Sequence, residues 1–180
     1  MLDHAILDGK IKDSDRVLDF GSGYDPHPRA DVWVDAYENN IYRGDGLDLK
    51  KSPKLTMIKD GDKLPFKDKE FDFVIASHTL QYLSDPEFYC GEIIRVGKGG
   101  YIEAPTREAD SIFGMPTNKW HIYLWRSRII FEPYKGPSMG NFFHKLYKEH
   151  EGFRSVYETN KRKFILSYFW KDSFKYEVRQ

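Results

Sequence analysis

The chain has 180 residues, 40% of them apolar, and a formal net charge of zero. This length suffices for one domain with a buried core, and no apolar run approaches the roughly 20 residues that a membrane-spanning helix needs. The first fifteen residues lack the apolar stretch of a secretory signal, and the single cysteine, Cys90, excludes an intramolecular disulfide. We therefore expect one cytoplasmic domain over residues 1–180, without a membrane segment.

The N-terminal part predicts a short helix followed by a strand. Residues 2–12 carry apolar side chains near helical spacing, which favours one short helix over the edge of a sheet. Residues 17–20 then form a buried-strand pattern that ends at Gly21, Ser22 and Gly23. A second apolar run, residues 32–34, ends at Asp35. Glycines allow a ligand to approach the backbone, and a carboxylate at a strand tip can accept both ribose hydroxyls, so this stretch predicts a nucleoside-binding edge.

The connection between these two strands is too short for a full crossover helix. Only eleven residues separate Gly23 from Asp35, and they include Pro26 and Pro28. Proline fixes φ and lacks an N–H, so we expect a compact loop or a single helical turn here. Residues 36–53 are polar and interrupted by glycine and proline, which favours an irregular surface segment.

The middle of the chain predicts alternating strands and helices. Residues 55–58 form a short strand, and residues 71–77 form the most apolar one, which we place at the centre of the sheet. A loop with a helical turn follows at residues 78–83. Ser84, Asp85 and Pro86 are typical of a helix start, and this helix ends at Gly97 before a strand at residues 100–104. This alternation favours a parallel α/β sheet.

Residues 107–180 are less regular. Aromatic side chains in residues 107–150 favour equally a wall over an active site and ordinary burial of irregular chain. Residues 128–132 could form a strand, and residues 163–178 predict two strands joined at residues 171–173. The pattern leaves open which of these strands completes the sheet.

The ordered segments VLDFGSG, VWVDAYE, DGDKLPFKDKEFDFVIASHTLQYLSDP and EIIRVGKGGYIEAP resemble the class I S-adenosylmethionine-dependent methyltransferases of the methyltransferase type 11 group. The resemblance covers about residues 15–106. It implies a Rossmann-like α/β fold with a mostly parallel, seven-stranded sheet whose last strand is antiparallel, here with a shortened first helix and a minimal N-terminal cap. Residues 1–106 would be the cofactor-binding half, and residues 107–180 the acceptor-side insertion and final strands.

The resemblance also implies roles for individual residues. Asp35 matches the acid that holds the ribose, and Asp60 the acid that accepts from the adenine amino group. His78 leaves the end of the central strand and is the best candidate for a general base, with pocket shaping as its alternative role. The cofactor-binding set is Asp19, Gly21, Ser22, Gly23, Asp35, Asp60, Gly61 and Ser77, and the acceptor-binding set is His78, Tyr82, Trp120 and His121.

Two features depart from the family pattern. Asp25 stands where a small residue usually follows the glycines, and the sequence DPHPR replaces the usual helix. Arg29 could supply a compensating cation there. No metal site is expected, because His78, His121 and Glu103 lack a short ligand spacing.

The sequence therefore predicts an S-adenosylmethionine-dependent methyltransferase acting on a small molecule or sugar precursor, with S-adenosyl-L-methionine as cofactor and a homodimer as one way to close the site. The alternative is a non-catalytic partner subunit whose donor site is degenerate. A dehydrogenase is disfavoured because Pro26 interrupts the dinucleotide fingerprint. Zero net charge disfavours a nucleic-acid partner.

Overall fold

A six-stranded, mostly parallel sheet forms the centre of the molecule in the computed structural model, which describes residues 4–38, 48–114, 116–135 and 139–180. The strand order is β3-β2-β1-β4-β5-β8. All neighbouring pairs are parallel except β5 and β8, which are antiparallel over Gly99–Pro105 and Ile165–Lys171. The strands are β1 (Val17–Phe20), β2 (Val32–Asp35), β3 (Leu55–Met57), β4 (Phe73–Ser77), β5 (Gly99–Pro105) and β8 (Ile165–Lys171).

The remaining described strands form a separate three-stranded sheet of order β6-β7-β9. They are β6 (Trp120–Trp125), β7 (Arg128–Pro133) and β9 (Lys175–Val178). The expectation of one seven-stranded sheet is therefore wrong for the described residues. Residues 163–178 do form two strands, but β8 joins the main sheet whereas β9 pairs in parallel with β7. The two consecutive strands part at the turn around Asp172, whose φ is +62°.

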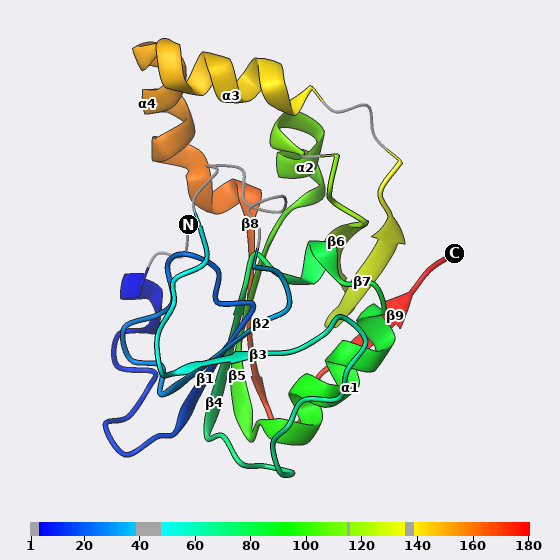
Figure 1. The fold of residues 1–180 in the computed structure, drawn as a ribbon. Helices are drawn as coiled ribbons and strands as arrows, with labels where there is room; N and C mark the ends of the chain where they lie inside the picture. Colours follow the sequence, from blue (N-terminus) through cyan, green and yellow to red (C-terminus); the bar gives the residue numbers. More distant parts are fainter. Residues whose placement is uncertain (1–3, 39–47, 115, 136–138) are drawn as a thin grey trace.

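Helix α1 packs beside the main sheet, and the other α-helices gather near one end of the strands (Figure 1). Helix α1 (Pro86–Val96) begins with Asp85 as N-cap, whose carboxylate accepts the Phe88 N–H, and with proline in its first turn. Helices α2 (Arg107–Phe113), α3 (Gly140–Glu149) and α4 (Glu151–Asn160) lie at the opposite end of the molecule from the start of β4. Three short 3₁₀ segments are η1 (His4–Leu7), η2 (Leu80–Tyr82) and η3 (Lys161–Phe164).

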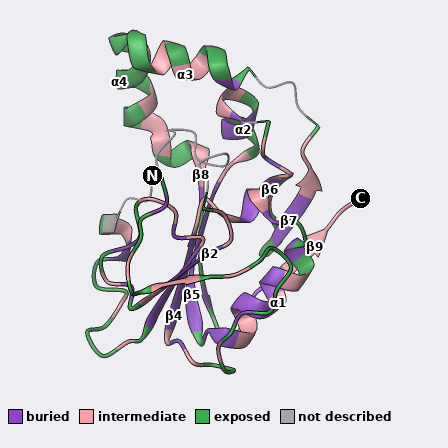
Figure 2. Cartoon of the chain, in the orientation of Figure 1, coloured by how far each residue is buried: buried purple, intermediate pink, exposed green. Residues whose placement is uncertain are grey.

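The sequence pattern did not predict α3 and α4, because their contacts are mainly aromatic rings from distant segments. The Phe113 ring lies 6.2 Å from that of Phe143, 6.3 Å from that of Phe153 and 4.8 Å from that of Tyr157. These rings join the helical pair to α2, while Gly140 is the single described residue of α3 and α4 that is buried. Figure 2 shows this pair largely exposed, in contrast to the sheet.

The core has two parts, one on each face of the main sheet. The larger cluster joins Leu18, Val74 and Ile102 to Ile93 of α1 and to Phe131 of the small sheet. The smaller cluster contains Val17, Trp33, Ile75 and Tyr101 with Leu7 of the N-terminal segment. In open α/β sheets, ligands bind at the carboxyl ends of the parallel strands.

The connecting segments near the N-terminus contain little regular secondary structure. Residues 24–31 contain turns and no helix, as the prolines predicted. The expected helix at residues 2–12 is reduced to η1, with residues 1–3 outside the described part. Residues 36–38 and 48–53 contain no helix or strand, and the rest of the predicted irregular segment lies outside the described residues. No described helix has the length and apolarity required to cross a membrane.

Candidate active site

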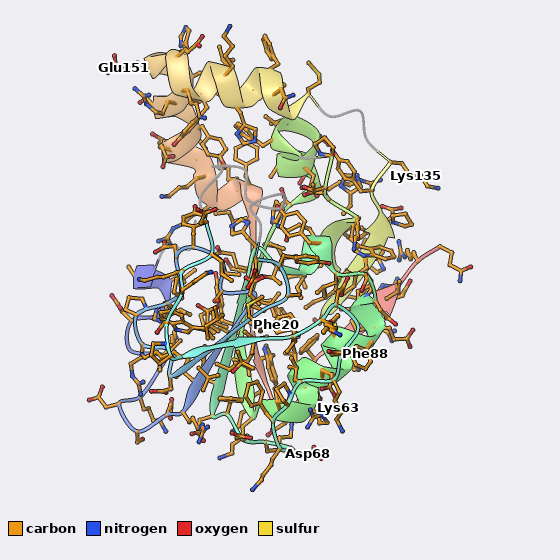
Figure 3. The ribbon with its side chains drawn as sticks, viewed as in Figure 1. Phe20, Lys63, Asp68, Phe88, Lys135 and Glu151 are labelled. Carbon is orange, nitrogen blue, oxygen red and sulfur yellow. The ribbon has the colours of Figure 1, made fainter. Side chains whose placement is uncertain are left out.

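A cavity of about 250 Å³ opens where the carboxyl ends of β1, β2 and β4 meet. This volume lies just below the range of roughly 300–1,000 Å³ that is typical of small-molecule sites. Figure 3 shows Phe20, one of the lining residues, in the middle of the molecule beside the strands. The lining is Asp19, Phe20, Gly21, Ser22, Gly23, Tyr24, Asp25, Val34, Asp35, Ala36, Tyr37, Ile58, Asp60, Ser77, His78, Thr79, Tyr82, Leu83 and Tyr89.

The glycine turn after β1 forms one wall and requires a residue without a Cβ. Gly21 and Gly23 have φ values of +73° and +57°. A Cβ on Gly21 would lie 2.2 Å from the Thr79 Oγ1. Thr79 cannot easily move, because its hydroxyl lies within 3.2 Å of the carbonyl oxygens of Phe20 and Gly21. The turn is thus fixed against the exit of β4, with its backbone facing the cavity.

Asp35 and Asp19 bring two carboxylates to the same side of the cavity. One Asp35 oxygen accepts the Gly23 N–H at 2.9 Å, and the other accepts the Tyr37 N–H at 3.0 Å. The Asp19 side chain accepts the His27 N–H at 2.7 Å and is 4% exposed. Burial is the main cause that raises the Asp19 pKa. The neighbouring acids Asp35 and Asp25 add to it and the His27 hydrogen bond opposes it, and together these effects bring the pKa to about 7.

Asp60 faces the cavity from the segment after β3. Its carboxylate accepts the Ser84 hydroxyl at 2.7 Å and the Tyr37 hydroxyl at 2.8 Å, and the Lys119 Nζ lies 4.0 Å away. Burial acts to raise the Asp60 pKa, but these two hydrogen bonds and the Lys119 charge outweigh it, so the pKa is lowered. Asp60 is therefore an anion that lines the same cavity as Asp35.

Ser77 and His78 form the wall at the end of β4. The Ser77 hydroxyl donates to Glu103 Oε1 at 3.1 Å, and the His78 Nε2 lies 3.1 Å from the same oxygen. Glu103 is 2% exposed and does not itself line the cavity. Burial acts to raise the Glu103 pKa, but its contacts with His78, Tyr101 and Ser77 outweigh burial and lower the pKa.

Nine of the predicted site residues line the cavity, and three do not. Gly61 lies outside it and donates its N–H to the Tyr89 hydroxyl at 2.7 Å. Trp120 does not line the cavity, and its indole N–H donates to the carbonyl of Leu83, which does. His121 is buried against Asp110, with its Nδ1 3.2 Å from that carboxylate, and burial lowers the His121 pKa. The nine are Asp19, Gly21, Ser22, Gly23, Asp35, Asp60, Ser77, His78 and Tyr82.

The expectation that Arg29 supplies a cation to this site is wrong. Its guanidinium donates to the carbonyl oxygens of Lys12, Asp13 and Asp15, at the beginning of β1 and away from the cavity. Among the described lining residues there is no lysine or arginine, whereas four are aspartates. The cavity is consequently negative and suits a cationic ligand.

Sequence reasoning assigned no site role to Tyr37, Thr79 or Tyr89. Tyr37 lines the cavity and joins the tips of β2 and β3 through its bond to Asp60. Its position two residues after a strand-ending acid is a signal that could have indicated it. Thr79 and Tyr89 carry no such signal, because only the packing of the β4 exit and α1 brings them to the cavity. Nor do the described residues contain a group of three or more His, Cys, Asp or Glu side chains suited to hold a metal ion.

Comparison with known proteins agrees with this geometry. Residues 32–102, from β2 into β5, match the family model described as a methyltransferase domain. The chain resembles this family over that segment, which contains β2, β3, β4 and α1. Proteins of this family use S-adenosylmethionine as methyl donor. No curated protein matches the chain.

One solved structure shares the fold of this chain, and two others are more distant. A Haloferax volcanii protein described as a candidate methyltransferase, solved in complex with the Trm112 methyltransferase activator, is 15% identical with a TM-score of 0.52, covering 91% of this chain and 84% of that one. An Aquifex aeolicus S-adenosylmethionine-dependent methyltransferase is 16% identical with a TM-score of 0.48, covering 93% and 88%. The YcgJ protein of Bacillus subtilis is 17% identical with a TM-score of 0.42, covering 57% and 49%. The match thus spans about half the length of YcgJ.

Proposed function

We propose that this chain is a methyltransferase domain that binds S-adenosyl-L-methionine in the cavity and transfers its methyl group to a small-molecule or sugar-precursor acceptor. The observation that carries the proposal is that Asp19, Asp35 and Asp60 line one cavity with the backbone of the glycine turn. Asp35 ends β2 and Asp60 follows the end of the neighbouring parallel strand β3, where acids that hold a ribose and an adenine would have to lie. When bound, the sulfonium group supplies an electrophilic methyl carbon.

The charge of the cavity supports this ligand over a dinucleotide. The described lining contains four aspartates without lysine or arginine, so a pyrophosphate would meet repulsion. S-adenosylmethionine carries two positive charges and one negative charge, and its net positive charge complements these acids. Val34, Ile58 and Leu83 supply the apolar surface that an adenine ring needs.

Residues of the chain would orient the donor and contact the acceptor. Asp35 and Asp60 orient the donor, and the glycine turn places backbone close to its amino acid portion. His78 and Tyr82 face the same cavity from the exit of β4 and would meet the acceptor. Because methyl transfer needs in-line approach and exclusion of water, orientation by these residues accounts for much of the catalysis. A homodimer contact over the opening would complete the enclosure.

A non-catalytic partner subunit is the second candidate, and Asp25 favours it. This exposed acid lines the cavity where a donor carboxylate would lie, and Arg29 is turned away from it. The Haloferax volcanii relative, solved with an activator protein, is the precedent for assembly of such a fold with a partner. In this case the domain would act by binding a partner protein and not by binding the methyl donor.

Thermal denaturation of the full chain with S-adenosylmethionine, S-adenosylhomocysteine and NAD separates these candidates. A ligand at 100 times its dissociation constant adds about 2.7 kcal/mol to the free energy of unfolding. We expect both sulfur nucleosides to raise the Tm and NAD to leave it unchanged. Failure of both nucleosides would support the partner subunit, and stabilisation by NAD alone would contradict the assignment.

A further inference from the structure

Glu103 is a buried carboxylate that lies next to the cavity without lining it. It belongs to β5, pairs in register with Ser77 of β4, and is 2% exposed. Oε1 accepts the Ser77 hydroxyl at 3.1 Å, and Oε2 accepts the Tyr101 hydroxyl at 2.8 Å. The Tyr101 hydroxyl also lies 2.9 Å from the Ser167 Oγ of β8. Such a network fixes the position of the carboxylate from both sides.

His78 is the one basic side chain within 4.0 Å of this carboxylate among the described residues. Its Nε2 lies 3.1 Å from Oε1, in ion-pair contact but without the alignment of a good hydrogen bond. Loose contacts of this kind are common in ligand-free active sites and tighten when substrate binds. The His78 side chain is 32% exposed and lines the cavity, whereas its Nε2 atom is buried.

The backbone of His78 is held in a conformation that the surrounding structure must maintain. Its φ is +51°, which is uncommon for a residue with a side chain. The His78 N–H donates to the Glu103 carbonyl at 2.8 Å, and the His78 carbonyl accepts the Gln81 amide at 2.8 Å. Both the main chain and the side chain of Glu103 therefore set where the imidazole points.

We propose that Glu103 is a positioning residue that holds the neutral His78 ring with its proton on Nε2, which leaves Nδ1 to take the proton of the methyl acceptor. This inference rests on the proposed function. In the balanced step, the proton of the acceptor passes to the His78 Nδ1, and the electron pair that it leaves on the acceptor atom forms the bond to the methyl carbon. The bond between that carbon and the donor sulfur breaks at the same time, which leaves the donor as a neutral thioether. Glu103 stays ionised and stabilises the imidazolium.

The alternative is a Glu103 that only supports the packing of β4 against β5 and β8. Packing alone requires the contacts to Ser77 and Tyr101, which a neutral side chain could also make. It gives no reason for one tautomer of His78. The tautomer is therefore the property that separates a positioning role from a structural one.

Nitrogen NMR of histidine-labelled full-length protein at neutral pH tests the proposal, with the His78 signal assigned by its loss in His78→Gln. We expect Nε2–H in the wild type, with and without S-adenosylhomocysteine. In Glu103→Gln, where the amide can donate to Nε2, we expect the Nε2–H population to fall at least about twofold. Ser167→Ala, which removes only the far contact to Tyr101, should leave the tautomer as in the wild type.

Three results would overturn the positioning role: Nδ1–H in the wild type, an unchanged tautomer in Glu103→Gln, or an equal change in Ser167→Ala. Calorimetry with S-adenosylhomocysteine on the same samples separates this outcome from failure of the proposed function. Absence of binding to the wild type would reject the donor site. Binding with the wrong tautomer would reject only the role of Glu103.

Discussion

Replacement of Asp35 by asparagine tests the donor site most directly. Both Asp35 oxygens already accept a backbone N–H, and the residue is 8% exposed, so hydrogen bonds from a ribose would form in a largely dry environment. A hydrogen bond to a charged group contributes about 1.5–3 kcal/mol. Asp35→Asn removes the charge and one of the two acceptor atoms. We therefore expect a loss of about 2 kcal/mol in binding, or roughly 30-fold in Kd.

The same substitution also weakens the fold, and the assay must separate the two effects. The new amide faces the N–H of either Gly23 or Tyr37, which costs about 1–3 kcal/mol of stability. Calorimetry with S-adenosylhomocysteine should be run well below the Tm measured for each variant. Asp31→Asn is the matched control. Asp31 immediately precedes β2 and accepts the N–H of Val17, the first residue of β1, at 2.8 Å, but it does not line the cavity.

The outcomes are distinct. We expect Asp31→Asn to reduce stability while the Kd stays that of the wild type. A Kd that changes less than about threefold in Asp35→Asn would refute the assignment of this carboxylate to the ribose, since such a change is below 1 kcal/mol. An equal loss of affinity in both variants would show that the effect acts through the fold.

Two further predictions concern stability. Gly21→Ala should lower the free energy of unfolding by about 2–4 kcal/mol in urea denaturation, because strain at positive φ adds to the overlap with Thr79. Gly9→Ala, with φ +70° and open space around it, should cost only about 1 kcal/mol, and equal losses would contradict the packing argument. Because burial raises the Asp19 pKa from 3.8 to about 7, the folded state favours the protonated acid, and stability should fall as the pH rises from 4 to 7, by up to about 1.4 kcal/mol per unit. In urea titrations at several pH values, Asp19→Asn should remove the contribution of Asp19 to this pH dependence of stability. The contribution of Asp110, whose pKa burial also raises to about 7, should remain. An unchanged pH dependence in Asp19→Asn would contradict the prediction.

Local patterns predicted the elements that position the cavity. Strands β1, β2 and β4 are mainly apolar and each contains one polar residue, namely Asp19, Asp35 and Ser77. A strand buried on both faces requires a mainly apolar composition wherever it lies in the sheet. Their boundaries were less accurate. The central strand begins at Phe73 and not at Phe71, which forms only an isolated bridge to Gly97. At the start of α1, Asp85 is the N-cap residue, whereas the hydroxyl of the preceding Ser84 donates to Asp60 and does not cap the helix.

The sequence by itself determined the parallel core, the glycine turn and the acids at the strand tips, because each depends on residues adjacent in the chain. Only the tertiary structure decided that β7 and β9 form a second sheet, that Arg29 faces the beginning of β1, and that Glu103 contacts His78. Those outcomes depend on which distant segments pack together. A one-dimensional pattern shows that a residue is apolar or charged, but its partner is set by the packing of the whole chain.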